Sequence, residues 1–418
     1  MASWAKLSPM KVAAVLVILP ILGAVIGYTT KWVSVQLIFK PARFIGIGPV
    51  GWQGVVQRRS PKFAAGVADM LAEVMPVGEI VGRVDVEGLV DAMTDRLAEV
   101  IDELAPKVLE AVRPGLWEEA APEARGMITT MIATEARAAL VEIGEETLPR
   151  LRDDFDMRPM VIEMLSGENA DRLARIVRSL ASRELRTVIR YGAVVGFFVG
   201  IVEAAVYLIF ERWWLLPLIG SIDGAVNNYM GIQMIFRPLE PRRYFGLFRY
   251  QGLFPARQVE IARDYGAMMA AEVLTPHAIA EQIVHSPVHA DLSRSVGEVL
   301  EGRLGAQLGM LGPMFGVEPT PELRARVVKT VMDGLGITVE AVVPDLDDYP
   351  TAVAYLERRL EIGKTIEDRL AAMTKTEFET ILRGIFEEDE KTLIAVGAVI
   401  GAGIGVLQAV IVLAVAPH

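Results

Sequence analysis

Four long apolar segments interrupt a chain that is otherwise amphipathic. A membrane-spanning helix needs about 20 apolar residues, because each residue adds about 1.5 Å along the helix axis. The segments run from Val12 to Phe39, Tyr191 to Phe210, Trp213 to Phe236 and Leu393 to Ala416. Only Glu211 and Arg212 join the second segment to the third, which predicts a tight helical hairpin at a membrane surface. We expect the first segment to remain as a helix, since no small-residue cleavage pattern follows it.

The chain carries one pattern twice. The segments Leu19-Pro20 and Gln36-Leu37-Ile38-Phe39-Lys40-Pro41 recur 197 positions later as Leu216-Pro217 and Gln233-Met234-Ile235-Phe236-Arg237-Pro238. Soon afterwards, Trp52-Gln53-Gly54-Val55 recurs as Tyr250-Gln251-Gly252-Leu253. The ends also match, with Gly192, Gly196, Gly200 and Glu203 corresponding to Gly397, Gly401, Gly405 and Gln408. Ordered, ungapped matches at both ends of each half indicate a tandem duplication.

The duplication predicts an all-α membrane protein with four transmembrane helices. Each of its two units reads as a transmembrane helix, a helical bundle domain and a second transmembrane helix. Apolar residues three and four positions apart, such as Leu97, Ile101 and Leu104, predict amphipathic helices in the polar domains. The expected divisions are 1–41 for the first transmembrane helix and interfacial box, 42–190 for the first polar domain, 191–241 for the transmembrane hairpin, 242–391 for the second polar domain and 392–418 for the C-terminal transmembrane helix.

The flanking charges predict the orientation in the membrane. Because each unit crosses the bilayer twice, both polar domains are expected on the same side. Lysine and arginine are enriched on the cytoplasmic side of inner-membrane proteins, and the domain side has far more of them. The opposite side has Lys6, Lys11 and Arg212, whereas the domain side has Lys31, Lys40, Arg43, Arg58, Arg59, Arg186, Arg190, Arg237, Arg242, Arg243, Arg249 and Arg257. We therefore expect cytoplasmic polar domains in a bacterial inner membrane.

Composition narrows the classes of function. The mean hydropathy is +0.37, which is high for a soluble protein, yet 23% of the residues are charged. The net charge of −11 argues against nucleic-acid binding, which depends on clustered basic residues. The chain has no cysteine, which excludes disulfides, thiolate metal sites and cysteine nucleophiles. Neither a phosphate-binding loop nor a serine nucleophile motif is present, so we expect no enzymatic activity and no cofactor.

The repeated motifs resemble one family of bacterial membrane proteins. The Gln-apolar-Ile-Phe-basic-Pro box, the Gln-Gly-apolar turn and the closing glycine-rich helix are similar to the YheB/YjiN-like family, whose domain has no assigned function. The resemblance covers both halves and includes Phe378-Glu379 and Glu388-Asp389. It implies an inner-membrane location and no established activity. The first half departs from the pattern, with Gln57 where the second has Pro255 and no Phe-Glu pair.

The two boxes lie where a helix is expected to leave the bilayer. Lys40 and Arg237 can extend toward lipid headgroups while their aliphatic stems stay in hydrocarbon, and the following proline ends the helix. One interpretation of the apolar, aromatic loops that follow is contact with the membrane interface; the other is a structural turn. The candidate lipid-interface residues are Lys40, Trp52, Arg59, Arg237, Tyr250 and Arg257.

Polar residues within the apolar segments are the second group of candidates. An unpaired carboxylate in a bilayer is costly, so it normally faces a cavity or a partner. Antiparallel packing of the predicted hairpin brings Glu203 and Asp223 to a similar depth. Together with Asn227 and Gln408 they are expected either to carry an ion or to form a hydrogen-bonded contact between helices.

Two further patterns have simpler explanations. Glycines four residues apart, such as Gly397, Gly401 and Gly405, predict close helix packing rather than dinucleotide binding. His285 and His289 have the spacing of metal ligands, but Pro287 between them disrupts the helical face, so no metal is expected.

The leading hypothesis is a non-enzymatic, membrane-anchored scaffold that contacts lipid headgroups or a partner protein. The alternative is a transporter or lipid conduit that uses the intramembrane polar residues. The expected partners are membrane lipid and an unidentified protein, and the sequence leaves homo-oligomerisation open.

Overall fold

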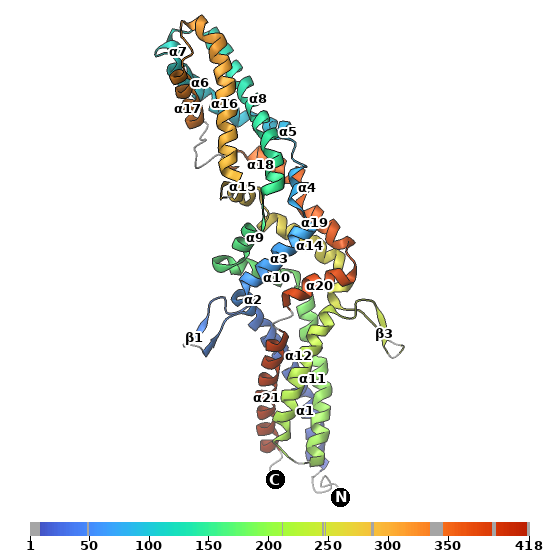
Figure 1. The fold of residues 1–418 in the computed structure, drawn as a ribbon. Helices are drawn as coiled ribbons and strands as arrows, with labels where there is room; N and C mark the ends of the chain where they lie inside the picture. The colour runs from blue at the N-terminus through green and yellow to red at the C-terminus, as the bar shows by residue number, and fades with distance from the viewer. Residues whose placement is uncertain are drawn as a thin grey trace. The chain divides into compact units, whose positions relative to one another are not determined.

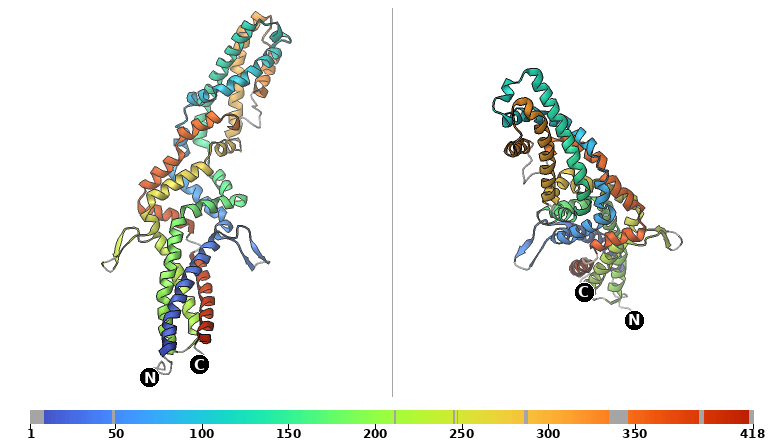
Figure 2. Two further views of the ribbon diagram at one scale, coloured as in Figure 1. Left: turned by 180° about the vertical axis from the view of Figure 1, so that it is seen from behind. Right: turned by 45° about the horizontal axis from the view of Figure 1, so that its top comes forward.

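The computed structural model describes residues 9–47, 50–210, 212–244, 246, 248–285, 288–334, 346–386 and 390–415. Helices make up nearly all of this part of the chain (Figures 1 and 2). Several residues used above lie outside it, namely Lys6, Glu211, Pro287, Glu388, Asp389 and Ala416.

The chain divides into two compact units that alternate along the sequence. Unit 1 comprises Met1–Met70, Ile162–Ala267 and Ile366–His418, and unit 2 comprises Leu71–Val161 and Met268–Thr365. Each unit therefore takes segments from both halves of the duplicated pattern. The sequence analysis divided the chain at its apolar segments instead, and that division stays a prediction. Helical periodicity shows which face of a helix is buried but not which helix covers it.

Four long helices pack side by side in unit 1 (Figure 1). They are α1 (Pro9–Phe39), α11 (Ser182–Phe210), α12 (Leu215–Phe236) and α21 (Glu390–Val415). Within the described residues, three segments are long and apolar enough to cross a membrane, namely Val15–Phe39, Ser182–Phe210 and Glu390–Ala414. The predicted third span, α12, is long enough, but Asp223, Asn227 and Asn228 make it more polar. The start of α1 and the end of α21 lie at the end of the bundle where α11 is followed by α12 (Figures 1 and 2).

Glycines let the long helices approach in two matching pairs. On α1 and α11, a Cβ atom added to Gly23 or Gly27 would overlap the carbonyl oxygen of Gly196 or Gly192. On α12 and α21, Gly220 and Gly224 meet Gly401 and Gly397 in the same way. Any larger residue at these positions would separate the two backbones. The helix contact predicted from the glycine spacing is therefore present in both pairs.

The bundle has an apolar exterior and polar groups in its interior. Val17, Phe198 and Val399 point outward and are 56%, 62% and 72% exposed. By contrast, Glu203 and Gln408 are 3% and 2% exposed. Water-soluble helical bundles show the reverse arrangement, whereas hydrocarbon favours apolar side chains outside and paired polar groups inside.

Each apolar loop that follows a box forms a short β-hairpin. In the first, β1 (Ile45–Ile47) pairs antiparallel with β2 (Val50–Trp52); in the second, β3 (Arg242–Tyr244) pairs with β4 (Phe248–Tyr250). The all-α prediction did not include these hairpins, because strands of three residues are too short to show a period-two pattern. The hairpins project to opposite sides of the bundle, at the end where α1 and α12 finish (Figures 1 and 2).

Shorter helices surround the hairpin end of the bundle and complete unit 1. Phe236, Phe254 and Phe378 meet there in a buried cluster with Ala181 and Ile261. The helices are α2 (Val55–Arg58), α3 (Ser60–Val74, which continues into unit 2), α9 (Arg158–Leu165, which begins in unit 2), α10 (Ala170–Leu180), α13 (Leu253–Ala256), α14 (Gln258–Glu272, which continues into unit 2), α19 (Ile362–Ala372, which begins in unit 2) and α20 (Lys375–Phe386).

Unit 2 is a bundle of amphipathic helices around an apolar core. Leu104 and Val108 from the first half pack with Val299, Leu300 and other buried residues from the second. Apolar residues of the two halves thus bury one another. The helices are α4 (Val77–Val81), α5 (Val86–Ala92), α6 (Thr94–Val112), α7 (Leu116–Glu119), α8 (Pro122–Asp154), α15 (Pro276–His285), α16 (Val288–Leu311), α17 (Pro321–Gly334) and α18 (Pro350–Leu360). Short 3₁₀ turns occur at η2 (Gly167–Asn169) in unit 1 and at η3 (Gly312–Phe315) and η4 (Leu346–Asp348) in unit 2.

Substitution of a contact glycine tests the packing of α12 on α21. Gly401→Leu places a side chain against the backbone of Gly220, and we expect it to lower the free energy of unfolding by about 1–3 kcal/mol. Gly403 lies two residues further along the same helix and a Cβ there meets nothing within 4 Å. Gly403→Leu is therefore the matched control, with an expected change within about 0.5 kcal/mol. Equal unfolding midpoints for the two variants in detergent would contradict the packing.

Candidate functional site

The two hairpins are attached to the bundle by corresponding hydrogen bonds. The indole Nε1 of Trp52 donates to the carbonyl of Leu37 over 3.1 Å, and the Tyr250 hydroxyl donates to that of Met234 over 2.6 Å. The side-chain amides that follow also donate to carbonyls, with Gln53 bonded to Ala42 and Gln251 to Leu239. In addition, the amides of Gly54 and Gly252 each donate to the carbonyl of a box proline at 2.9 Å. Equivalent bonds thus fix the base of each hairpin to the last turn of α1 or α12.

Burial raises the pKa of Tyr250 to about 12, because an anionic phenolate is poorly solvated in this position. The hydroxyl therefore keeps its proton at neutral pH and remains a hydrogen-bond donor to Met234. Tyr250 and Trp52, both predicted as lipid-interface residues, are thus tied to the end of a long helix in this structure.

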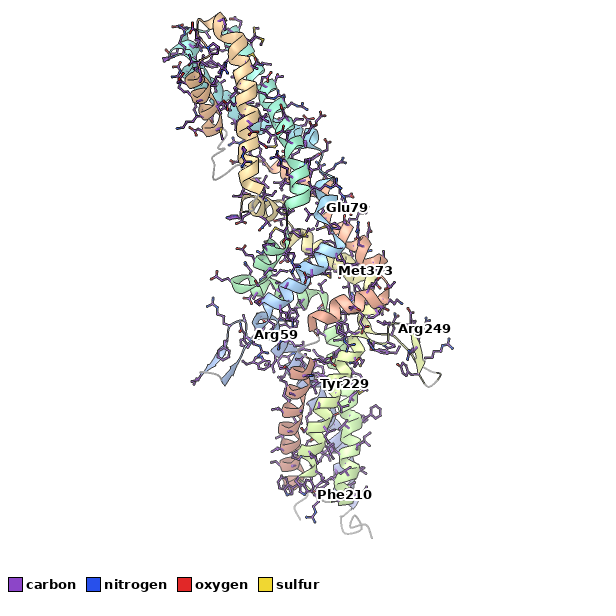
Figure 3. The ribbon with its side chains drawn as sticks, viewed as in Figure 1. Arg59, Glu79, Phe210, Tyr229, Arg249 and Met373 are labelled. Atoms are coloured by element: carbon purple, nitrogen blue, oxygen red, sulfur yellow. The ribbon has the colours of Figure 1, made fainter. Side chains whose placement is uncertain are left out.

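The outer strand of the first hairpin is strongly apolar and exposed. Phe44, Ile45 and Ile47 are 50%, 68% and 90% exposed. The second hairpin instead combines Tyr244, which is 44% exposed, with arginines. These are Arg242, Arg243 and Arg249, and Arg249 is labelled on this hairpin in Figure 3. One hairpin therefore offers apolar contact, and the other offers aromatic contact with positive charge.

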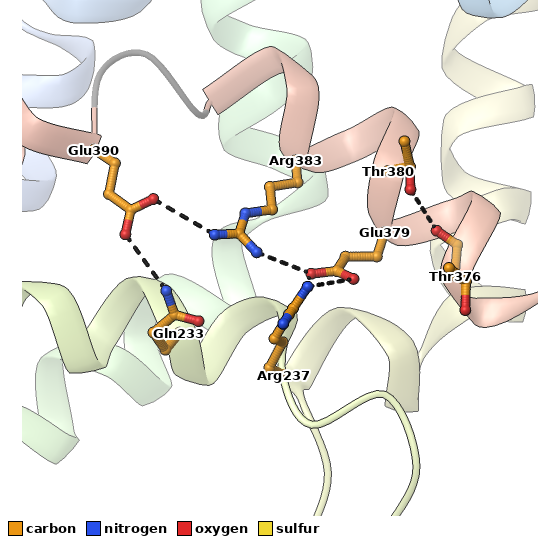
Figure 4. Close-up of polar contacts among 7 residues, drawn as sticks. All are labelled: Gln233, Arg237, Thr376, Glu379, Thr380, Arg383 and Glu390. Carbon is orange, nitrogen blue, oxygen red and sulfur yellow. Dashed lines mark hydrogen bonds and ion pairs between the residues drawn. The ribbon is translucent and has the colours of Figure 1, made fainter.

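The basic residues of the boxes differ in their surroundings. Lys40 is exposed, whereas the guanidinium of Arg237 lies against the carboxylate of Glu379, with Nε at 2.8 Å from Oε1 (Figure 4). Arg383 also contacts Glu379, at 3.3 Å, and lies 3.7 Å from Glu390 (Figure 4). This network ties α20 to the end of α12. The Phe378-Glu379 pair noted in the sequence thus supplies the carboxylate that holds Arg237.

The two arginines that follow the turns are placed within unit 1. Arg257 forms ion pairs with Glu184, which is 2% exposed, and with Glu260. Arg59 is half-buried just before α3 (Figure 3). The predicted lipid contact of Arg257 therefore competes with a buried carboxylate, and its role at the interface stays a prediction.

All four predicted intramembrane residues line one small cavity inside the four-helix bundle. The cavity has a volume of 30 Å³, and its polar lining is Thr30, Lys31, Glu203, Asp223, Asn227, Asn228 and Gln408. Glycines of the two packed helix pairs form much of the remaining wall. The expected proximity of Glu203 and Asp223 is thus present, and each of the four helices contributes to the cavity.

Glu203 accepts a hydrogen bond from the side-chain amide of Gln408, with Nε2 at 2.6 Å from Oε2. These two residues occupy corresponding positions in the two halves of the chain. Lys31 and Asn228 also correspond, 197 positions apart, and the Lys31 ammonium donates to Asn228 Oδ1 over 2.8 Å. Corresponding side chains therefore meet each other at two levels of the bundle.

Lys31 lies inside the bundle and is only 4% exposed. The sequence predicted it among the flanking charges on the side of the polar domains, and that prediction is wrong. Its ammonium also donates to the backbone carbonyl of Asn227 over 2.8 Å. The available signal was its alignment with Asn228, a polar residue within the third apolar segment.

No group of three or more His, Asp or Glu residues arranged for metal binding occurs in the described part of the chain. The Nδ1 atom of His285 donates to the backbone carbonyl of Glu281 over 2.8 Å. At the polar cavity, the ionisable groups are one ammonium and two carboxylates, and the other polar groups are neutral amides and a hydroxyl.

Comparisons with known proteins identify relatives over part of the chain. A UPF0754 membrane protein of Bacillus pumilus is 29% identical over 113 residues, which is 26% of this chain and 30% of the relative. The UPF0754 membrane protein YheB of Bacillus subtilis is 37% identical over 89 residues, 21% of this chain and 23% of the relative. A UPF0754 membrane protein of Shouchella clausii is 26% identical over 187 residues, 38% of this chain and 48% of the relative.

The matched regions span 30% of the Bacillus pumilus relative and 48% of the Shouchella clausii relative, so the chain aligns with less than half of each. No family model matches the chain. No solved structure matches it either. The relatives' names describe membrane proteins and state no activity, which agrees with the apolar helices of unit 1. The resemblance inferred from the repeated motifs is thus confirmed: over these segments the chain is homologous to UPF0754 membrane proteins, including YheB of Bacillus subtilis.

Proposed function

We propose that this protein is a non-enzymatic scaffold anchored in a bacterial inner membrane, and that its two hairpins contact lipid headgroups. The exposed apolar strand of the first hairpin carries the proposal. Ile47 is 90% exposed, and Phe44 and Ile45 beside it are also exposed. Apolar and aromatic groups next to arginine favour the boundary between hydrocarbon and headgroups.

The position of the hairpins supports an interfacial role. Both lie at one end of the four-helix bundle and project to its sides (Figure 1). The hydrogen bonds from Trp52 and Tyr250 hold them at the last turns of α1 and α12. A hairpin attached there extends along the membrane surface if the four helices span the bilayer. The anchored chain would then present its polar segments to a partner protein at the membrane.

The proposal includes four spans, a tandem duplication and cytoplasmic polar segments. The fourth span is supported by the packing of α12 on α21 through the same glycine contacts that join α1 and α11. The duplication is supported by the matching hydrogen bonds at the two hairpins. Arginine and lysine at the hairpin end favour a cytoplasmic location for that end.

The polar cavity favours transport as a second candidate function. Glu203, Asp223, Asn227 and Gln408 all line it, as a site for an ion or polar group in a bilayer would require. The amide bond from Gln408 to Glu203 also fits a structural contact, which is why we place the scaffold first.

A fluorescent reporter on the first hairpin tests the interfacial contact. Because the chain has no cysteine, Ile47→Cys creates a unique attachment site. We expect a dye at this position to be quenched several-fold more strongly by lipids with a nitroxide near the headgroup than by soluble nitroxide. Met127→Cys, at a residue of unit 2 that is 75% exposed, is the control and should show the opposite preference. Equal responses at the two sites would contradict the proposed contact.

Labelling of single cysteines in membrane vesicles tests the orientation. A membrane-impermeant maleimide should react with Met127→Cys from the cytoplasmic side. It should react with Trp214→Cys, at the turn between α11 and α12, from the opposite side. Labelling of both cysteines from one side would be incompatible with the proposed topology.

Ion flux in reconstituted vesicles tests the transport alternative. If the protein carries an ion through the cavity, Glu203→Gln and Asp223→Asn should each reduce flux at least tenfold, since each removes a cavity carboxylate. Glu379→Gln changes a buried carboxylate outside the cavity and should leave flux unchanged. Flux that is equal in all of these vesicles, or absent with the unaltered protein, excludes transport.

A further inference from the structure

The polar cavity of the four-helix bundle holds an excess of negative charge. Lys31 is the positively charged residue of its described lining, while Glu203 and Asp223 are both acidic. The other four polar residues of the lining carry neutral amide or hydroxyl groups; they are Thr30, Asn227, Asn228 and Gln408. With every group ionised, one negative charge has no positive partner. A net charge enclosed by helices in hydrocarbon is unfavourable unless a counter-ion or a proton neutralises it.

The hydrogen bonds show where the excess lies. The Lys31 ammonium donates to Asn228 Oδ1 and to the Asn227 carbonyl, and it interacts electrostatically with Asp223. Glu203 receives only the neutral amide of Gln408 and is also repelled by Asp223. An amide donor stabilises a carboxylate but does not cancel its charge. Lys31 therefore offsets Asp223, and Glu203 carries the negative charge for which the described lining supplies no cation.

Unpaired oxygen atoms at the cavity provide a second, independent observation. The side-chain carbonyl oxygen of Asn227 has no hydrogen-bond partner in the described structure, although Asn227 is only 5% exposed. The hydroxyl of Thr30 is also buried without a partner there. A carbonyl oxygen can only accept, so it requires a donor or a cation. Both residues line the same cavity as the two carboxylates.

The cavity is large enough for a small ligand only. A volume of 30 Å³ has room for roughly one or two water-sized species. Lipid chains and organic solutes are too large, and a divalent cation would reverse the charge rather than cancel it. A single monovalent cation matches both the volume and the charge.

We propose that this cavity binds one monovalent cation, a proton or Na⁺, which balances Glu203 and Asp223 against Lys31. The oxygen atoms of the two carboxylates, Asn227 and Thr30 are the ligands of Na⁺, whereas a proton binds to one carboxylate oxygen. The groups facing the cation are Lys31 from α1, Glu203 from α11, Asp223 from α12 and the neutral Gln408 from α21. The site goes beyond the scaffold function and does not require the cation to cross the membrane.

Charge-changing variants of the full-length protein in detergent test the proposal. The unaltered protein should bind one cation per chain. Glu203→Gln and Asp223→Asn should each abolish binding, because either substitution leaves one carboxylate to balance Lys31. The double variant Lys31→Gln with Glu203→Gln should bind one cation again, since Asp223 then has no positive partner. A merely structural role for these residues would not restore binding in the double variant.

Two measurements distinguish the sources of the positive charge. Retention of radioactive sodium reports Na⁺, and the infrared band of a protonated carboxylic acid reports a proton. A sodium-bound site should show retention that saturates and falls at low pH, whereas a proton site should show the acid band at neutral pH without sodium retention. Glu379→Gln is the matched control, because Glu379 is 5% exposed and lies outside the cavity; it should behave as the unaltered protein.

Each outcome of these experiments either supports or overturns the proposed cation site. Loss of the signal in both single variants and its return in the double variant support the proposal. Absence of both signals in the unaltered protein overturns it, as does a signal that persists in both Glu203→Gln and Asp223→Asn. If one single variant fails to fold, as judged by its elution and circular dichroism, the other single variant still decides. The lipid contacts of the hairpins are measured separately, so either result is independent of the scaffold function.

Discussion

Direct backbone contact between helices is the constraint on which the rest of unit 1 depends. In both helix pairs, glycine lies where one helix faces a carbonyl of the other, and there is no space for a Cβ atom. Beside these contacts the bundle encloses a small polar cavity, whose side chains bond to each other. A separate apolar cluster that includes Leu19, Tyr207 and Leu216 fills another part of the interior. Many other apolar side chains face outward, as hydrocarbon favours.

The repeated motifs form corresponding hydrogen bonds at the base of each hairpin. Aromatic and amide side chains that correspond in sequence, such as Trp52 and Tyr250, donate to carbonyls that also correspond. The exposed surfaces of the two hairpins nevertheless differ, one being apolar and the other rich in arginine. The shared bonds position each hairpin, while the exposed residues determine what each can contact. Two hairpins held in the same way can therefore make different contacts.

The parts of the structure that were predictable from sequence depend on local spacing. Glycines four residues apart identified the helix contacts, and counting from the hairpin turn brought Glu203 and Asp223 to one depth. The location of Lys31 was not predictable in this way, because a lysine near the end of an apolar segment can equally extend to headgroups. The three-residue strands were too short for a periodic signal. The grouping of segments into units depends on contacts between distant helices, about which an amphipathic pattern says nothing.

The alternation of the two units along the sequence sets the order in which the chain can assemble. Helix α6 ends at Val112, whereas α16, which covers part of the same core, begins only at Val288. At ribosomal rates of about 5–20 residues per second, the interval between their synthesis is roughly 10–35 s. During that time the apolar stripe of α6 can pack against α8 but lacks the part of its core that α16 and α17 supply. By contrast, α1 and α11 are both complete by Phe210 and can already pair. The membrane pair of the first half can therefore form while the core of unit 2 still awaits the second half of the polypeptide.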